Sequence, residues 1–136
     1  MQQYWDLTVN RSHGYERIEQ KLATSSQRNL AVSAITVWEI FRMAEKAKVP
    51  TKASKAALEI LSSFRIVAHT SQAAALGGQV HAGLSNIGQT IGKRDSMIAG
   101  IALAHQYILV TDNTRELVRV RGLFLENWRS ADAKTP

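Results

Sequence analysis

Cysteine is absent from this chain of 136 residues, and proline occurs only twice. Without cysteine, neither a disulfide framework nor a thiolate metal site can form, which suits a reducing compartment. No apolar run is long enough to span a bilayer, and the N-terminus lacks the apolar stretch of a signal peptide. These absences predict a soluble, cytoplasmic protein without a membrane anchor.

The sequence also lacks repeats, low-complexity tracts and Pro/Gly-rich linkers, so we expect one domain. A chain of this length can bury roughly two-thirds of the surface of its unfolded state, which is enough for a sizeable core. We place this domain at residues 1–130 and expect a loose C-terminal tail over residues 131–136.

Charge is unbalanced, with 17 Lys and Arg against 11 Asp and Glu and a net charge of +6. Such an excess favours a polyanionic partner, because binding releases counterions and attraction acts over a long range. Nucleic acid is one such partner, and an acidic protein is the alternative.

Short apolar runs alternate with amphipathic segments along the chain. The runs predict strands and the segments predict helices. This alternation predicts a three-layer α/β/α sandwich with a mainly parallel central sheet, in which functional residues collect at the carboxyl ends of the strands. The expected strands are 29–33, 65–69, 107–111 and 123–125, and the expected helices are 36–49, 52–63, 71–84, 96–105 and a short one from Thr114.

Three acids fall at strand ends or helix starts. Asp112 follows the strand at 107–111, Asp95 opens the preceding helix, and Glu39 lies early in the helix after the first apolar strand. Carboxylates that converge repel one another unless a cation neutralises them. Oxygen ligands without Cys or paired His favour Mg²⁺ or Mn²⁺, which can activate a water that attacks a phosphodiester.

Each acid also has a purely structural explanation. Thr36 and Glu39 have the spacing of a capping box, and residues 113–116 have the same spacing. Asp95 is a suitable N-cap for the helix that follows it. Spacing alone leaves these alternatives open.

Two basic residues, Lys93 and Arg94, directly precede Asp95. They are candidates for contact with RNA phosphates, and solvated loop charges are the alternative. The four histidines show no spacing typical of a metal site.

Two segments carry a family resemblance: LAVSAITVWEI (30–40) and IGQTIGKRDSMIAGIALAHQYILVTDNTRELVRVRGLFLENW (87–128). They resemble PIN-domain proteins, and more closely the VapC toxins of bacterial toxin–antitoxin pairs. That family carries a Ser-Ala-Ile-Thr step before a helix with Glu, then "IGxxDxxIAGxA", "LVTxNTREF" and "GLxxENW" stretches. The match covers most of the chain.

The resemblance implies a PIN-like fold and an endoribonuclease that uses Mg²⁺ or Mn²⁺ in the bacterial cytoplasm. It further implies a homodimer that is inhibited by a cognate VapB-like antitoxin. The relatives with this pattern act on transfer RNA, so structured RNA is the expected substrate. The alternative is a catalytically impaired PIN-like protein that binds its antitoxin or RNA without cleavage.

Residue by residue, Glu39 corresponds to the acid after the Ser-Ala-Ile-Thr step. Asp95 corresponds to the acid of the "IGxxD" step, which implies a metal ligand. Thr111 and Asn113 belong to the strand-end triplet with supporting roles, and either Asp112 or Asn113 faces the metal. Arg115 and Glu116 match the "TRE" step, with a structural role.

The N-terminus departs from the family pattern. Family members have a strand that ends in Asp-Thr-Asn, with the Asp as a principal metal ligand, whereas here these letters are spread over residues 6–10. Asp6 lies at close to the usual interval before Glu39 and is the best match. The expected catalytic set is Asp6, Glu39, Asp95 and Asp112, with the metal held by Asp6 and Asp95.

Overall fold

The computed structural model of the chain describes residues 3–5, 15–26, 29–129 and 134–135. Within these residues one sheet has the order β3-β2-β1-β4-β5-β6. Its neighbours are parallel except for β6, which pairs antiparallel with β5, so the mainly parallel sheet is confirmed. The strands are β1 (Gln3–Trp5), β2 (Leu30–Ser33), β3 (Arg65–Val67), β4 (Ile108–Val110), β5 (Phe124–Glu126) and β6 (Lys134–Thr135).

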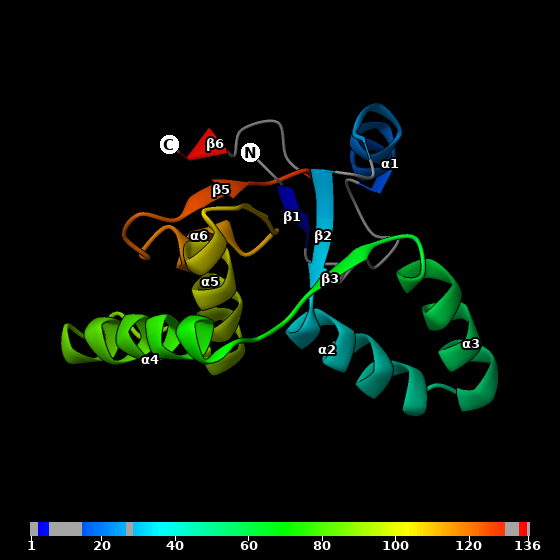
Figure 1. Ribbon diagram of the computed structural model, residues 1–136, viewed down its shortest axis with the longest axis horizontal. Coiled ribbons are helices and arrows are strands. Elements are labelled where there is room, and N and C mark those ends of the chain that lie inside the picture. Colours follow the sequence, from blue (N-terminus) through cyan, green and yellow to red (C-terminus); the bar gives the residue numbers. More distant parts are fainter. Residues whose placement is uncertain (1–2, 6–14, 27–28, 130–133, 136) are drawn as a thin grey trace.

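Helices lie on both sides of the sheet, and α2 and α3 form a hairpin that projects away from it (Figure 1). None of the helices in the described ranges is long and apolar enough to cross a membrane. The helices are α1 (Tyr15–Thr24), α2 (Ala34–Glu45), α3 (Pro50–Leu61), α4 (Ser71–Asn86), α5 (Lys93–His105) and α6 (Thr114–Leu117).

Alternating strand residues build a separate core on each face of the sheet. Ala31 and Leu109 pack with α4 and α5 in the larger core, whereas Leu30 and Val110 pack with Ile18 of α1 in the smaller one. Successive side chains of a strand point to opposite faces, so a central strand that is apolar throughout supplies both cores. This arrangement confirms the three-layer α/β/α sandwich.

The first strand occupies the centre of the sheet. In β1, Tyr4 pairs with Ala31 on one side and with Leu109 on the other. The strand ends at Trp5, and Asp6, the expected first metal ligand, lies outside the described residues. The expected tail at 131–136 is also outside them, apart from the two residues of β6.

Glycine lets α4 and α5 approach closely. A Cβ on Gly100 would lie 2.2 Å from the carbonyl oxygen of Ala73, and a Cβ on Gly77 would lie 2.7 Å from that of Ser96. No real Cβ tolerates such contacts, so only glycine permits this crossing. The crossing fixes the N-terminal turn of α5, which carries Asp95.

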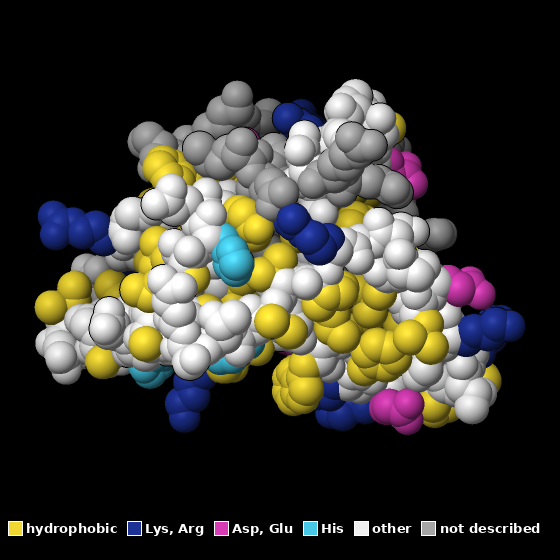
Figure 2. Space-filling model, viewed as in Figure 1, with side chains coloured by type: hydrophobic (Ala, Val, Ile, Leu, Met, Phe, Trp, Pro, Cys, Tyr) yellow, Lys and Arg dark blue, Asp and Glu magenta, His cyan; other side chains and the backbone are white. Residues whose placement is uncertain are grey.

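Exposed apolar side chains gather on the α2–α3 hairpin (Figure 2). The ring of Trp38 is exposed and lies 5.7 Å from the guanidinium carbon of Arg42. Large apolar surfaces left open to water are typical of protein interfaces. The hairpin surface consists of Trp38, Met43, Val49, Leu58 and Ile60.

Candidate active site

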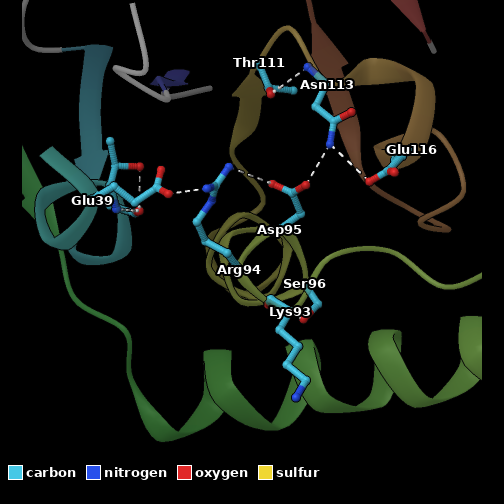
Figure 3. A network of polar contacts seen from close by, with 10 residues as sticks. Glu39, Lys93, Arg94, Asp95, Ser96, Thr111, Asn113 and Glu116 are labelled. Carbon is cyan, nitrogen blue, oxygen red and sulfur yellow. Dashed lines mark hydrogen bonds and ion pairs between the residues drawn. The ribbon is translucent and has the colours of Figure 1, made fainter. Parts of the chain in front are cut away.

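Polar side chains from separate segments meet near the carboxyl ends of the central strands (Figure 3). Glu39 comes from α2, which follows β2, and Asp95 comes from the first turn of α5. Asn113 follows β4, and Glu116 lies in α6. The parallel topology thus brings together residues that are far apart in the sequence.

Asp95 is buried, with 8% of its surface exposed. Its Oδ2 accepts a hydrogen bond of 2.7 Å from the side-chain amide of Asn113. The same amide donates a longer bond, 3.3 Å, to Oε2 of Glu116. Asn113 therefore joins two carboxylates and orients both.

The expectation that Asp95 opens its helix is wrong, and so is its alternative role as the N-cap. Helix α5 begins at Lys93, and its N-cap is Gly92, which has no side-chain capping bond. Asp95 is thus inside the first turn, and its carboxylate is turned toward Asn113.

Glu39 is even more deeply buried, at 3% exposure. Its Oε1 accepts a hydrogen bond from the Arg94 guanidinium, while its Oε2 is buried and has no hydrogen-bond partner among the described residues. The capping-box alternative, with Thr36 as the N-cap, is wrong. Ser33 is the N-cap of α2, and its Oγ accepts a 3.0 Å hydrogen bond from the backbone amide of Thr36. A buried carboxylate oxygen without a partner is costly and points to a ligand or a water.

Arg94 lies between the two buried acids (Figure 3). One guanidinium nitrogen pairs with Glu39, and the other lies 3.9 Å from Oδ1 of Asp95. Lys93 points the other way, toward α4. Of the two cations expected to meet phosphate, Arg94 is at the acids and Lys93 is not.

Asp112 and Asn113 take different directions. The side chain of Asp112 is half exposed, and its Oδ2 lies 3.6 Å from Nε of Arg129. Asn113 faces Asp95, and its backbone amide donates a 3.1 Å bond to Oγ1 of Thr111, which holds the turn. Thr111 thus supports Asn113, and the strand-end residue beside Asp95 is Asn113.

The electrostatics of the site disfavour an ionised Asp95. Burial raises the pKa of its carboxyl group above the ordinary value, and the negative charges of Glu116 and Asp112 raise it further. The hydrogen bond from Asn113 and the charge of Arg94 oppose this shift without cancelling it. Additional positive charge nearby would therefore favour the ionised form of Asp95.

In the described part of the chain, no three Asp, Glu or His side chains meet closely enough to hold a metal ion. The donor chemistry nevertheless fits Mg²⁺ or Mn²⁺, because carboxylate and amide oxygens are the ligands that these cations prefer. A cation would supply a partner for Oε2 of Glu39, which has none among the described residues. It would also favour the ionised form of Asp95, whose pKa is raised. Asp6, the next residue in the sequence after Trp5, lies outside the described residues.

Comparison with known proteins identifies the family of the chain. Residues 5–123 match the PIN domain. The chain belongs to the PIN-domain family. Its relatives place it among the VapC proteins of that family, and the resemblance inferred from the sequence is confirmed.

Two curated relatives and one solved structure illustrate the similarity. The chain is 35% identical to the tRNA(fMet)-specific endonuclease VapC of Shigella flexneri, over 76% of this chain and 78% of the relative. It is 38% identical to ribonuclease VapC2 of Haemophilus influenzae, over 73% of this chain and 75% of the relative. The crystal structure of DNA-bound VapBC from Salmonella typhimurium has a TM-score of 0.83 at 27% identity, covering 94% of this chain and 99% of that chain.

The expected catalytic set did not include Glu116, to which the resemblance gave a structural role. In the structure, Oε2 of Glu116 accepts a hydrogen bond from the side-chain amide of Asn113, which also donates to Asp95. The signal was the spacing of three residues from Asn113, which puts both side chains on one side of a short helix.

Proposed function

We propose that this PIN-domain protein is an endoribonuclease of the VapC kind that uses Mg²⁺ or Mn²⁺ to cleave structured RNA such as transfer RNA. The observation that carries the proposal is the pair of buried acids, Glu39 and Asp95, at the carboxyl edge of the sheet. Buried carboxylates of this kind are expensive for a fold to keep and are typical of a site that binds a cation. The names of the relatives, a tRNA-specific endonuclease and a ribonuclease, support RNA as the substrate.

In this proposal Asp95 and Asp6 hold the metal, and Glu39 and Glu116 add negative charge near it. Asn113 fixes the orientation of Asp95 through its 2.7 Å hydrogen bond. Asp112 does not belong to this group of acids, because its half-exposed carboxylate pairs with Arg129. We therefore assign it a supporting role in place of the catalytic role that the sequence suggested.

A divalent cation bound there would lower the pKa of an attacking water and offset the charge that develops on the scissile phosphate. The chain's own residues would direct the reaction. Oε2 of Glu39, which accepts no hydrogen bond from the part of the chain that the structure describes, can accept a proton of that water and orient it toward the phosphorus atom. The amide of Asn113 keeps Asp95 from rotating while the substrate binds.

The net charge of +6 supports RNA binding in general, because basic residues neutralise phosphates without reading a sequence. A VapB-like antitoxin is the proposed protein partner, as in the VapBC complex from Salmonella typhimurium. The exposed apolar residues of the α2–α3 hairpin are of the kind that a protein partner covers. We also propose a homodimer, as the family resemblance implies, in a bacterial cytoplasm, since these relatives come from bacteria.

The experiment is cleavage of purified transfer RNA by the full chain. We expect cleavage with Mg²⁺ or Mn²⁺, none with EDTA, and recovery when the metal is added back. Asp95→Ala should abolish cleavage while the far-UV circular dichroism spectrum stays unchanged. Undiminished cleavage by that variant would show that the site is elsewhere.

One observation favours a second function. The pairing of Arg94 with Glu39 leaves fewer carboxylate oxygens for a metal. If this pairing is permanent, the protein binds its antitoxin or RNA without cleaving. That function requires the absence of turnover at every Mg²⁺ and Mn²⁺ concentration, and cleavage that stops with EDTA excludes it.

A further inference from the structure

Arg94 makes ion pairs with both buried acids of the site. Its guanidinium donates a hydrogen bond to Oε1 of Glu39 and lies 3.9 Å from Oδ1 of Asp95. The two carboxylates come from α2 and α5, and Figure 3 shows the guanidinium between them. Among the described residues, Arg94 is the cation that forms ion pairs with both acids.

The physical consequence is competition for the same oxygens. Two buried carboxylates need positive charge nearby, and here a guanidinium supplies it. A divalent cation held by Asp95 beside Glu39 would stand within a few ångströms of that guanidinium, and like charges at such a distance repel strongly in a partly buried site. Arg94 and the metal therefore cannot both stay in contact with these acids at low cost.

Arg94 is much more exposed than the two acids. Its side chain is 44% exposed, while those of Glu39 and Asp95 are 4% and 12% exposed. Among the described residues, the hydrogen bond and ion pairs of Arg94 are those with the two acids. A long arginine side chain at the start of a helix can reach solvent by rotating its own torsion angles.

We propose that Arg94 is a positioning residue that occupies Glu39 and Asp95 until a divalent metal displaces its guanidinium. This inference rests on the proposed metal-dependent function and deepens it. In the metal-free protein Arg94 keeps the two acids neutralised and in place. After displacement, the free guanidinium stands at the edge of the site, where a phosphate of the RNA would be its next partner.

The test measures the binding of Mn²⁺ alone to the full chain by isothermal titration calorimetry near neutral pH. Arg94→Gln removes the competing charge, and Lys93→Gln is the matched control because it removes the same charge from the neighbouring residue, whose side chain points away from the acids. Arg94→Lys keeps a cation at this position and should restore affinity close to that of the original protein.

We expect Arg94→Gln to bind Mn²⁺ roughly tenfold more tightly, the factor equivalent to about 1.4 kcal/mol. Lys93→Gln should change the affinity by less than about twofold, because its charge is distant and screened. Thermal melting gives a second readout, in which saturating Mn²⁺ raises the melting temperature more in Arg94→Gln than in the original protein. If Arg94→Gln does not fold, Arg94→Met keeps most of the apolar stem and serves in its place.

Three results overturn the inference. Equal Mn²⁺ affinity in the original protein and Arg94→Gln would mean that Arg94 does not compete, while the metal-dependent function would stand. An equal gain of Mn²⁺ affinity in Lys93→Gln would mean that the effect comes from general surface charge. Absence of Mn²⁺ binding in every variant would overturn the metal-dependent function together with the inference.

Discussion

The side-chain amide of Asn113 donates a 2.7 Å hydrogen bond to the carboxylate of Asp95, across 18 positions of the sequence. This bond ties the turn after β4 to the first turn of α5 and fixes where the buried carboxylate points. An amide in this position satisfies Asp95 without adding a charge, whereas a carboxylate would repel it. The relationship determines how the site responds to mutation and to pH.

Asp95→Asn should stabilise the protein while it removes activity. The substitution removes a buried charge whose ionised form is disfavoured by burial and by neighbouring acids. In metal-free buffer near neutral pH we expect the free energy of unfolding to rise by roughly 0.5–2 kcal/mol, the range of known stabilising substitutions. Cleavage of RNA should fall by more than about a hundredfold, because a proposed metal ligand is lost. Urea denaturation and a cleavage assay measure the two effects, and a less stable variant would contradict the electrostatic account.

The stability of the metal-free protein should depend on pH through the same carboxyl group. The raised pKa means that the folded state holds this proton to a higher pH than the unfolded chain, whose ordinary value is 3.8. Where the folded state binds more protons, the free energy of unfolding falls as pH rises. The contribution of Asp95 is therefore most favourable below 3.8, declines through its raised pKa, and is level above it. Urea denaturation of the original protein and of Asp95→Asn at a series of pH values isolates this contribution. The free energy of unfolding of the original protein minus that of the variant should fall as pH rises, and a rise would contradict the prediction.

Asn113→Asp should destabilise the metal-free protein. A carboxylate at this position would replace a donor that lies 2.7 Å from Asp95 and 3.3 Å from Glu116 with a third negative charge. We expect a loss of about 1–3 kcal/mol, as when a buried polar group loses its partner. Added Mn²⁺ should restore part of this stability, because the extra carboxylate favours a cation.

The matched control is Asp112→Asn, one position earlier, where the side chain is half exposed and pairs with Arg129. Its free energy of unfolding should change by less than about 0.5 kcal/mol, as is usual for surface sites. Thermal or urea unfolding with and without Mn²⁺ measures both variants. Equal losses in the two would mean that the direction of Asn113 toward Asp95 is not what matters.

Much of this fold could be predicted because its elements have clear periodicity. The apolar run at 107–111 became β4, and the segment after Pro50 became α3. Helix α1 was not predicted, although Ile18 and Leu22 are apolar residues that it turns toward the sheet. The i, i+4 spacing of Ile18 and Leu22 in a mostly polar segment is the helical signal that could have found it.

Residue types at the site were easier to predict than side-chain directions. The chain order placed Asp112 and Asn113 at the same strand end, but only the turn held by Thr111 determines which of them faces Asp95. Likewise, the early start of α5 at Lys93 puts Arg94 in the first turn, where it reaches the acids. Such directions depend on backbone geometry within a single turn, which sequence spacing does not specify.

Gly100→Ala should destabilise the protein strongly, because α4 and α5 touch at this glycine. The added Cβ would lie 2.2 Å from the Ala73 carbonyl oxygen and 2.8 Å from the Gly77 nitrogen, so the helices would have to separate. Both neighbours are backbone atoms and cannot rotate away. We expect a loss of at least about 3 kcal/mol, at the upper end for overpacked cores. Because α5 carries Asp95, cleavage should fall as well.

The matched control for this glycine is Gly83→Ala in α4, where an added Cβ meets nothing within 4 Å. Alanine is the better helix former, so this variant should gain roughly 0.5–1 kcal/mol. Urea denaturation of the two variants gives opposite signs if the helix crossing is the cause. A small loss in Gly100→Ala would mean that α5 shifts easily along α4, and the first turn of α5 would then not be fixed by this contact.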